Sequence, residues 1–148
     1  MKQLEIKNGE QIIDVNESSD YYIKAIIDQL TEVKQRITFN FNKANISSQL
    51  KIDLLLESES DIELEVIIIG QRDTTGIESG IEMNALLLNP KAKIKFIPSL
   101  EINEKDVLID HSSSIGPPDQ EVVAYAKSRG LSYNDLVNLF KENFNGDR

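Results

Sequence analysis

Apolar and polar residues alternate through residues 1–110, which predicts a mainly β protein. The clearest alternation lies at 61–69, where every second residue is Ile, Leu or Val and acidic residues lie between them at first. Residues 37–41 repeat this period of two. Further strand-like runs, bounded by Ser, Asn, Asp and Gly, lie at 50–56, 81–88, 94–97 and 107–109. Short strands at short intervals are typical of a sandwich, a barrel or a β-solenoid, and periodicity alone does not choose among the three.

The segment 21–30 fits two kinds of structure. Its apolar residues can all be placed on one face of a helix, whereas its β-branched content favours a strand. We expect a strand there.

After His111 the pattern changes from β to helical. Residues 112–118 hold three serines, a glycine and two prolines, which predicts a loop. A helix is expected from Asp119 to about 128, because Pro and acidic residues favour its start and Arg-Gly at 129–130 its end. A second helix is expected to begin at Ser132, with Asp135 completing a capping box. Its expected apolar face consists of Tyr133, Leu136, Val137, Phe140 and Phe144. The chain is therefore expected to have a β body over 1–111 and a C-terminal helical segment over 112–148.

The amino-acid composition excludes several classes of site and partner. The 148-residue chain has no cysteine, one histidine and a formal net charge of -9, and its length suits one domain. Without cysteine, the chain has no thiolate nucleophile and cannot hold zinc or an iron–sulfur cluster by its own sulfurs. The acidic balance disfavours nucleic acid and anionic membranes as partners. No apolar run has the length of a signal peptide or a membrane span, so we expect a cytoplasmic protein.

His111 is the one histidine of the chain, and Asp110 precedes it. It can serve as a metal ligand or a proton-transfer group, but from the residue alone an ordinary hydrogen-bonded histidine is the simpler interpretation. Four nearby acidic residues can also be imagined around a divalent cation, although a solvated strand face explains them better. They are Glu101, Glu104, Asp106 and Asp110.

A series of short motifs runs from residue 86 to residue 130. In order, it has Leu-Leu-Leu-Asn-Pro-Lys-Ala at 86–92, Pro-Ser-Leu-Glu-Ile at 98–102, Asp-Val at 106–107, His-Ser-Ser-Ser-Ile-Gly at 111–116 and Ser-Arg-Gly at 128–130. In order and spacing this series resembles the C-terminal part of the SufB and SufD family, the scaffold components of the SUF system of iron–sulfur cluster assembly. SufB-type members carry a cysteine implicated in cluster assembly, and this chain has none. In its chemistry the chain is therefore more similar to SufD.

The resemblance implies a truncated right-handed parallel β-helix followed by helices. In the family the helical segment docks onto the SufC ATPase, and SufB with SufD forms the platform on which a nascent cluster is built. The carried-over docking residues are Asp119, Glu121, Tyr125, Arg129, Gly130, Leu136, Phe140 and Phe144. The resemblance also makes His111 a candidate metal ligand, because it matches a family histidine linked to iron or cluster handling at the SufB–SufD interface.

We therefore expect a non-enzymatic scaffold or partner protein of SUF-type assembly. Its expected partners are a SufC-type ATPase, a SufB-type protein and a second copy in a homodimer. No resident cofactor is expected, and iron or a cluster would contact the chain only transiently and in a complex. Two alternatives stay open: a self-associating structural β-solenoid without an assembly role, and a small metal-binding protein that uses His111 with Asp110 or Glu101.

Overall fold

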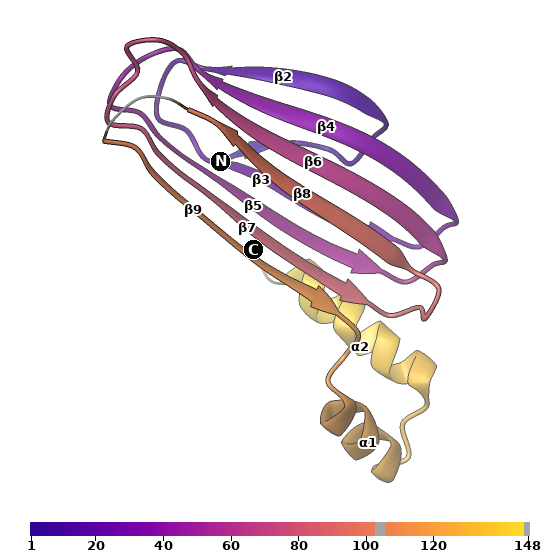
Figure 1. The fold of residues 1–148 in the computed structure, drawn as a ribbon. Coiled ribbons are helices and arrows are strands. Elements are labelled where there is room, and N and C mark those ends of the chain that lie inside the picture. The colour runs from indigo at the N-terminus through magenta and orange to yellow at the C-terminus, as the bar shows by residue number, and fades with distance from the viewer. Residues whose placement is uncertain (103–105, 147–148) are drawn as a thin grey trace.

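The computed structural model describes residues 1–102 and 106–146. Two parallel β-sheets face each other, and two helices follow at the C-terminal end (Figure 1). The first sheet has the order β1 (Lys2–Gln3), β3 (Tyr21–Ile27), β5 (Ser47–Leu56), β7 (Glu78–Leu87) and β9 (Leu108–Gly116). The second has the order β2 (Gly9–Val15), β4 (Thr31–Phe41), β6 (Ser60–Gly70) and β8 (Lys93–Glu101). Successive strands alternate between the sheets, so the chain winds through about four turns of a β-solenoid.

The mainly β fold and the parallel β-solenoid are confirmed, as is the strand in segment 21–30, which contains β3. The loop expected over 112–118 is wrong for its first part, because β9 continues to Gly116. Residues 112–116 pair in register with residues 82–86 of β7. That pairing uses main-chain groups, so a run of serines can form it without any apolar alternation. Of the acidic candidates, Glu104 lies outside the described residues.

The core lies between the two sheets and consists mainly of branched aliphatic side chains. In-register pairing stacks inward side chains of successive turns above one another. Ile23, Ile52 and Met83 form one such row in the first sheet, and all three are fully buried. Ile37 and Val66 do the same in the second sheet. Each turn thus buries its apolar face against its neighbours, which one turn alone could not do.

At the N-terminal end of the solenoid, the segment before β2 covers part of the core. Leu4 is buried in the core, and the segment around it is held to β4 by polar side chains. The buried Gln35 side chain donates to the carbonyl of Glu5 at 2.9 Å and accepts from the Lys7 N–H at 3.2 Å. The Asn8 side chain accepts from the main-chain N–H of residue 34 at 2.7 Å. These contacts satisfy main-chain groups before β2 and at the start of β4, whereas β2 itself pairs only with β4.

The C-terminal segment forms helices α1 (Gln120–Ser128) and α2 (Tyr133–Gly146). Asp119 caps α1, because its carboxylate accepts from the N–H of Glu121 at 2.8 Å. The predicted capping box of α2 is present: the Ser132 N–H donates to the Asp135 carboxylate at 2.9 Å, and the Asp135 N–H donates to the Ser132 hydroxyl at 3.1 Å. Gly130 follows α1 with a φ of 83°, the left-handed conformation that ends many helices.

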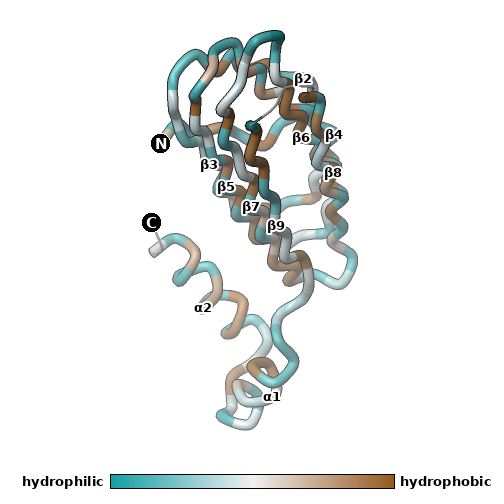
Figure 2. The backbone as a smooth tube through the Cα atoms, turned by 60° about the vertical axis from the view of Figure 1, so that its left-hand side comes forward, coloured by the Kyte–Doolittle hydropathy of each residue, from teal (hydrophilic) through white to brown (hydrophobic). Residues whose placement is uncertain are grey.

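Helix α2 joins the hairpin to the solenoid, lying beside the outer face of the first sheet (Figure 2). Its apolar residues pack on four side chains of β3, β5, β7 and the turn after β7, which are Ile26, Leu55, Leu86 and Leu88. Lys141 forms an ion pair with Glu57 at 2.8 Å, and the hydrogen bond between them raises the pKa of Lys141. The Tyr133 hydroxyl donates to the carbonyl of Leu88. Helix α1 packs on α2 through Val123 and Ala126, so α2 is the anchored member of the pair.

Removing a stacked core side chain should destabilise the whole solenoid. Leu64→Ala should lower the free energy of unfolding by about 2–5 kcal/mol, because Leu64 has no exposed surface and its loss leaves a cavity. Leu30 is the matched control, since it is 81% exposed between β3 and β4. Leu30→Ala should change stability little, and chemical denaturation of both variants measures the difference. Equal losses would contradict the assigned core.

The capping box should give α2 a pH-dependent stability. Hydrogen bonds from Ser132 hold the pKa of Asp135 below its usual value. The carboxylate therefore stabilises the fold at pH above the usual aspartate pKa, and this contribution is lost as pH falls through the lowered pKa. Asp135→Asn should reduce helix content or the melting temperature near neutral pH, and the difference from wild type should vanish in strong acid. Circular dichroism follows both; a difference that does not depend on pH would contradict the role of the charge.

Candidate functional site

The last strands at the C-terminal end of the solenoid have free edges, as β2 does at the N-terminal end. Within residues 1–102 and 106–146, β8 pairs only with β6, and β9 pairs only with β7. Three large apolar side chains are exposed there: Leu100 (52%), Leu108 (66%) and Ile115 (41%). A free strand edge with apolar side chains beside it is a template for pairing with another chain. This open end is one candidate interaction surface.

His111 lies in this open end, within β9. It is in register with the buried Ile81, so its side chain belongs to the inward face of the first sheet. The imidazole is nevertheless exposed, because β9 is the last strand of that sheet. Asp110 and Glu101 fall on outward faces, since their register partners Gly80 and Ile69 do not belong to the inward rows. The structure therefore does not bring His111 together with either carboxylate that sequence reasoning offered it.

Metal ligation by this chain alone has little geometric support. Among the residues that the structure describes, no group of three or more His, Cys, Asp or Glu side chains is arranged to hold a metal ion. The chain also has no cysteine thiolate. Within the described part of the chain, His111 therefore belongs to no such group.

The residues carried over for ATPase docking fall into two groups. Asp119, Glu121, Tyr125, Arg129 and Gly130 are exposed on or beside α1. The Arg129 guanidinium lies over the Tyr125 ring, 5.4 Å from its centroid. The other three pack inside the protein: Leu136 is buried between the helices, and Phe140 and Phe144 are half-buried against the first sheet.

Sequence reasoning missed several exposed apolar residues of the hairpin. Val122 (46%), Leu131 (37%) and Leu139 (44%) are exposed although they are apolar. With Tyr125 (62%) they make the hairpin a second candidate interaction surface, here called the hairpin surface. The signal was present in the sequence as apolar residues outside the face assigned to packing. Neither described helix is long and apolar enough to cross a membrane.

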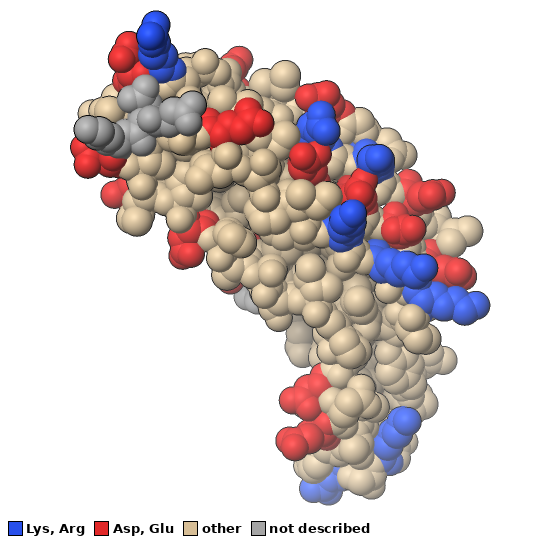
Figure 3. Space-filling model, viewed as in Figure 1, with Lys and Arg blue, Asp and Glu red and all other residues tan. Residues whose placement is uncertain are grey.

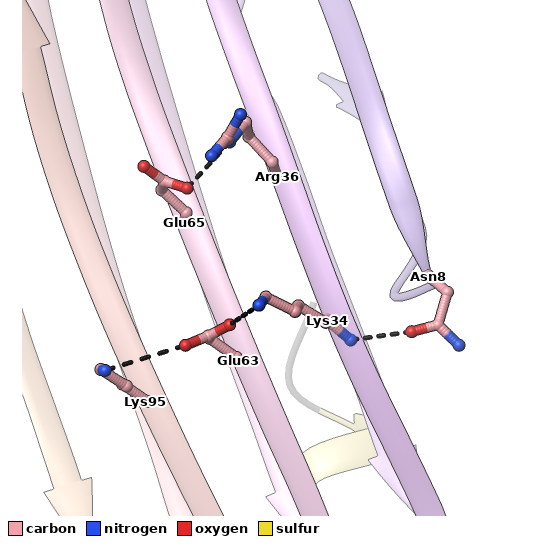
Figure 4. Close-up of polar contacts among 6 residues, drawn as sticks. All are labelled: Asn8, Lys34, Arg36, Glu63, Glu65 and Lys95. Carbon is pink, nitrogen blue, oxygen red and sulfur yellow. Dashed lines mark hydrogen bonds and ion pairs between the residues drawn. The ribbon is translucent and has the colours of Figure 1, made fainter.

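The outer face of the second sheet carries rows of alternating charge. Glu63 forms ion pairs with Lys34 at 3.5 Å on one side and with Lys95 at 3.8 Å on the other, and Arg36 contacts Glu65 at 2.8 Å (Figure 4). The hydrogen bond from Arg36 to Glu65 raises the pKa of Arg36. Acidic and basic side chains intermix over this face (Figure 3). Such exposed pairs add little stability, but they disfavour a shifted register, and the first row ends on Lys95 at the free edge of β8.

A groove of about 680 Å³ separates the end of α2 from the first sheet. Its charged groups already contact other groups: Lys51 lies 3.9 Å from Asp53, and the Lys24 ammonium lies 5.0 Å from the Phe144 ring centroid. Both lysines of the groove therefore already contact a neighbouring side chain.

Comparison with known proteins identifies the family. A family model described as "SUF system FeS cluster assembly, SufBD core domain" matches residues 8–144, which include β2 through most of α2. A protein of Archaeoglobus fulgidus named "Iron-sulfur cluster assembly SufBD family protein" is 31% identical over 77 residues, 52% of this chain and 20% of that protein. The aligned part thus spans about a fifth of the length of this curated relative. As the motifs at 86–130 predicted, the chain belongs to the SufBD family of SUF-system iron–sulfur cluster assembly proteins.

Proposed function

We propose that this chain is a non-enzymatic, cytoplasmic scaffold of SUF-type iron–sulfur cluster assembly that docks a SufC-type ATPase through its C-terminal helices. Family membership supports the assembly role. The observation that carries the docking role is the hairpin surface, where Val122, Tyr125, Leu131 and Leu139 stay exposed on helices that are firmly attached. Exposed aromatic and aliphatic side chains on a rigid element are suited to anchor a partner.

The different packing of the two helices supports this role: α2 packs on the solenoid, and α1 packs on α2. Phe140 and Phe144 attach α2 to the solenoid, and Leu136 attaches α2 to α1. The residues buried in these contacts hold the hairpin in place, and Tyr125 on α1 remains free to enter a partner's surface. The carried-over docking residues therefore include both the contact surface and its support.

The open end supports a second partner, which is another copy of the chain or a SufB-type protein. A partner strand there would bury Leu100 and Ile115 and satisfy the free edges of β8 and β9. The same partner would cover His111. Iron or a nascent cluster is handled as cargo in this proposal, and it meets His111 only where a partner supplies further ligands.

The open end also favours one different candidate function, a self-associating solenoid without an assembly role. Both functions use β8 and β9, so association alone does not separate them. Binding of the ATPase separates the two functions, because only the scaffold needs the hairpin surface.

Substitutions on the hairpin surface should weaken ATPase binding. Tyr125→Ala should raise the dissociation constant for a SufC-type ATPase of the same organism at least about tenfold, as expected for an aromatic anchor. Ile12→Ala is the control, since the exposed Ile12 lies on β2, in the sheet that α2 does not contact, and it should bind as wild type does. Isothermal titration calorimetry measures both, and circular dichroism checks folding. Absence of wild-type binding would reject the docking role.

The chain alone should not retain metal through His111. Wild type and His111→Ala, purified in parallel, should contain equal iron and zinc by elemental analysis, because the described residues offer this imidazole no group of three ligands. A higher content in wild type would instead support the small metal-binding protein that uses His111.

A further inference from the structure

The first turn of the solenoid takes a shorter path than the turn that follows it. Strand β1 ends at Gln3, and residues 5–8 then cross to the second sheet, where β2 begins at Gly9. The next turn continues along the first sheet as far as Ile27 before it crosses. Within the described chain, β3 therefore pairs on its β1 side only as far as Tyr22, and its last residues have a strand on the β5 side alone.

This last part of β3 is less buried than the same part of the next turn. Residues 25–27 of β3 are apolar and half-buried. Their register partners, residues 54–56 of β5, are three leucines, each at most 2% exposed. Strand β5 lies between β3 and β7, so its end is covered on both sides. A further strand beside the end of β3 would bury apolar surface that this chain leaves partly open.

The groove of about 680 Å³ follows this edge. It is lined by five consecutive residues of β3, 22–26, and by Phe144 and Asn145 at the end of α2. Neighbouring residues of a strand point to opposite faces, so a groove that all five line runs along the edge of the strand and not over one face of the sheet. Its volume is within the range of about 300–1,000 Å³ that is typical of binding pockets.

The main chain of β3 is oriented to accept a further strand. The Leu4 N–H donates to the Tyr22 carbonyl at 2.8 Å, so the even-numbered residues of β3 direct their main-chain groups to this edge. The odd-numbered Ile27 faces β5, since its carbonyl accepts from the N–H of Glu57 at 2.9 Å. The carbonyl of Ile26 therefore points to the edge that the groove follows, where an added strand can donate to it.

Strand β5 shows which kind of segment fits beside this part of β3. Its residues 53–56, Asp-Leu-Leu-Leu, pair in register with residues 24–27. The aspartate lies beside Lys24, the first and third leucines lie beside inward residues, and the second leucine lies outward under α2. A segment on the other side of β3 would meet the same four side chains. One acidic residue followed by three apolar residues therefore suits that side as well.

The acidic position has a precedent in the second sheet. Glu63 lies between Lys34 and Lys95 there and forms an ion pair with each. In the first sheet, Lys24 lies beside Asp53 on β5. A carboxylate on an added strand would place Lys24 between two opposite charges in the same way, whereas a basic side chain would repel it.

We infer that the edge of β3 over residues 24–27 binds an extended segment of another protein, which carries one acidic residue followed by three apolar residues. The segment would add a strand parallel to β3, as β1 and β5 both are, and would fill the groove beside the end of α2. This edge lies at the other end of the first sheet from β9. The inference therefore goes beyond the proposed ATPase docking and does not depend on it.

A synthetic peptide tests the inference on the full chain. The probe is acetyl-Lys-Thr-Asp-Val-Trp-Val-Thr-Lys-amide, in which Asp, Val, Trp and Val take the places beside residues 24–27. The chain has no tryptophan, so tryptophan fluorescence reports the peptide alone. The peptide should bind saturably with a dissociation constant below about 1 mM, and its emission should shift to shorter wavelength as the indole is buried.

Methylation of single main-chain nitrogens tests strand addition. In the parallel register, the N–H of the second valine donates to the Ile26 carbonyl, whereas the main-chain N–H of tryptophan points away from β3. Methylation at the valine should therefore raise the dissociation constant at least about tenfold. Methylation at the tryptophan is the matched control, and it should change the constant little.

Charge reversal tests the acidic position. Lys24→Glu should raise the dissociation constant about fivefold, as expected for a partly exposed ion pair. A peptide with lysine in place of aspartate should bind Lys24→Glu better than it binds wild type. Lys43→Glu, which reverses an exposed charge in the loop after β4, should bind the original peptide as wild type does. Circular dichroism checks that each variant is folded.

Four outcomes would overturn the inference. Three are the absence of saturable binding up to about 1 mM, equal losses from the two methylations, and equal binding by wild type and Lys24→Glu. The fourth is peptide binding that weakens as the chain concentration rises, since a second copy of the chain would then be the occupant. Tyr125→Ala should bind the peptide as wild type does. A chain that binds the ATPase but no peptide rejects only this inference, and the converse rejects only the proposed docking.

Discussion

In-register parallel pairing is the constraint on which the rest of this structure depends. Because each strand pairs in register with the strand of the preceding turn, each paired side chain lies directly above that of a residue about one turn earlier. Inward rows such as Ile23, Ile52 and Met83 become continuous apolar columns. Outward rows become ladders in which opposite charges alternate, as around Glu63. The same geometry leaves an unpaired strand edge wherever the repetition stops, so the end strands of the solenoid must be covered or paired in another way.

Both ends of the solenoid leave a free strand edge, and they differ in the side chains that lie beside it. At the N-terminal end, Gln35 and Asn8 bind main-chain groups near the edge, and Leu4 fills the core. At the C-terminal end, the described residues leave Leu100 and Ile115 exposed beside free strands. A polar inward pair, His111 and Ser113, interrupts the apolar inner face there. An apolar column that ends on a histidine is better explained by a partner that meets it than by packing within one chain.

Alternation and helix-capping residues predicted much of the fold. The strict alternation after residue 61 identified β6, and Ser132 with Asp135 identified the start of α2, because both signals act over a few residues. Strand β9 was missed beyond His111, since its serines carry no alternation and only β7 determines their conformation. The sequence likewise singled out His111 but could not show that it is an inward residue of a last strand. Leu136 and Leu139 look alike in sequence, and only the packing of α2 makes one buried and the other exposed.

The two candidate surfaces are joined by a short and stiff connection. Strand β9 ends at Gly116, and α1 begins at Gln120, so the strand that lines the open end leads almost directly into the hairpin. Pro117 and Pro118 fix two of the intervening φ angles, which limits independent movement of α1. The second attachment, Lys141 with Glu57, ties α2 to the segment after β5. A partner that displaces the hairpin surface would therefore pull directly on the end of β9. A partner bound along β9 would in turn fix the orientation of the hairpin.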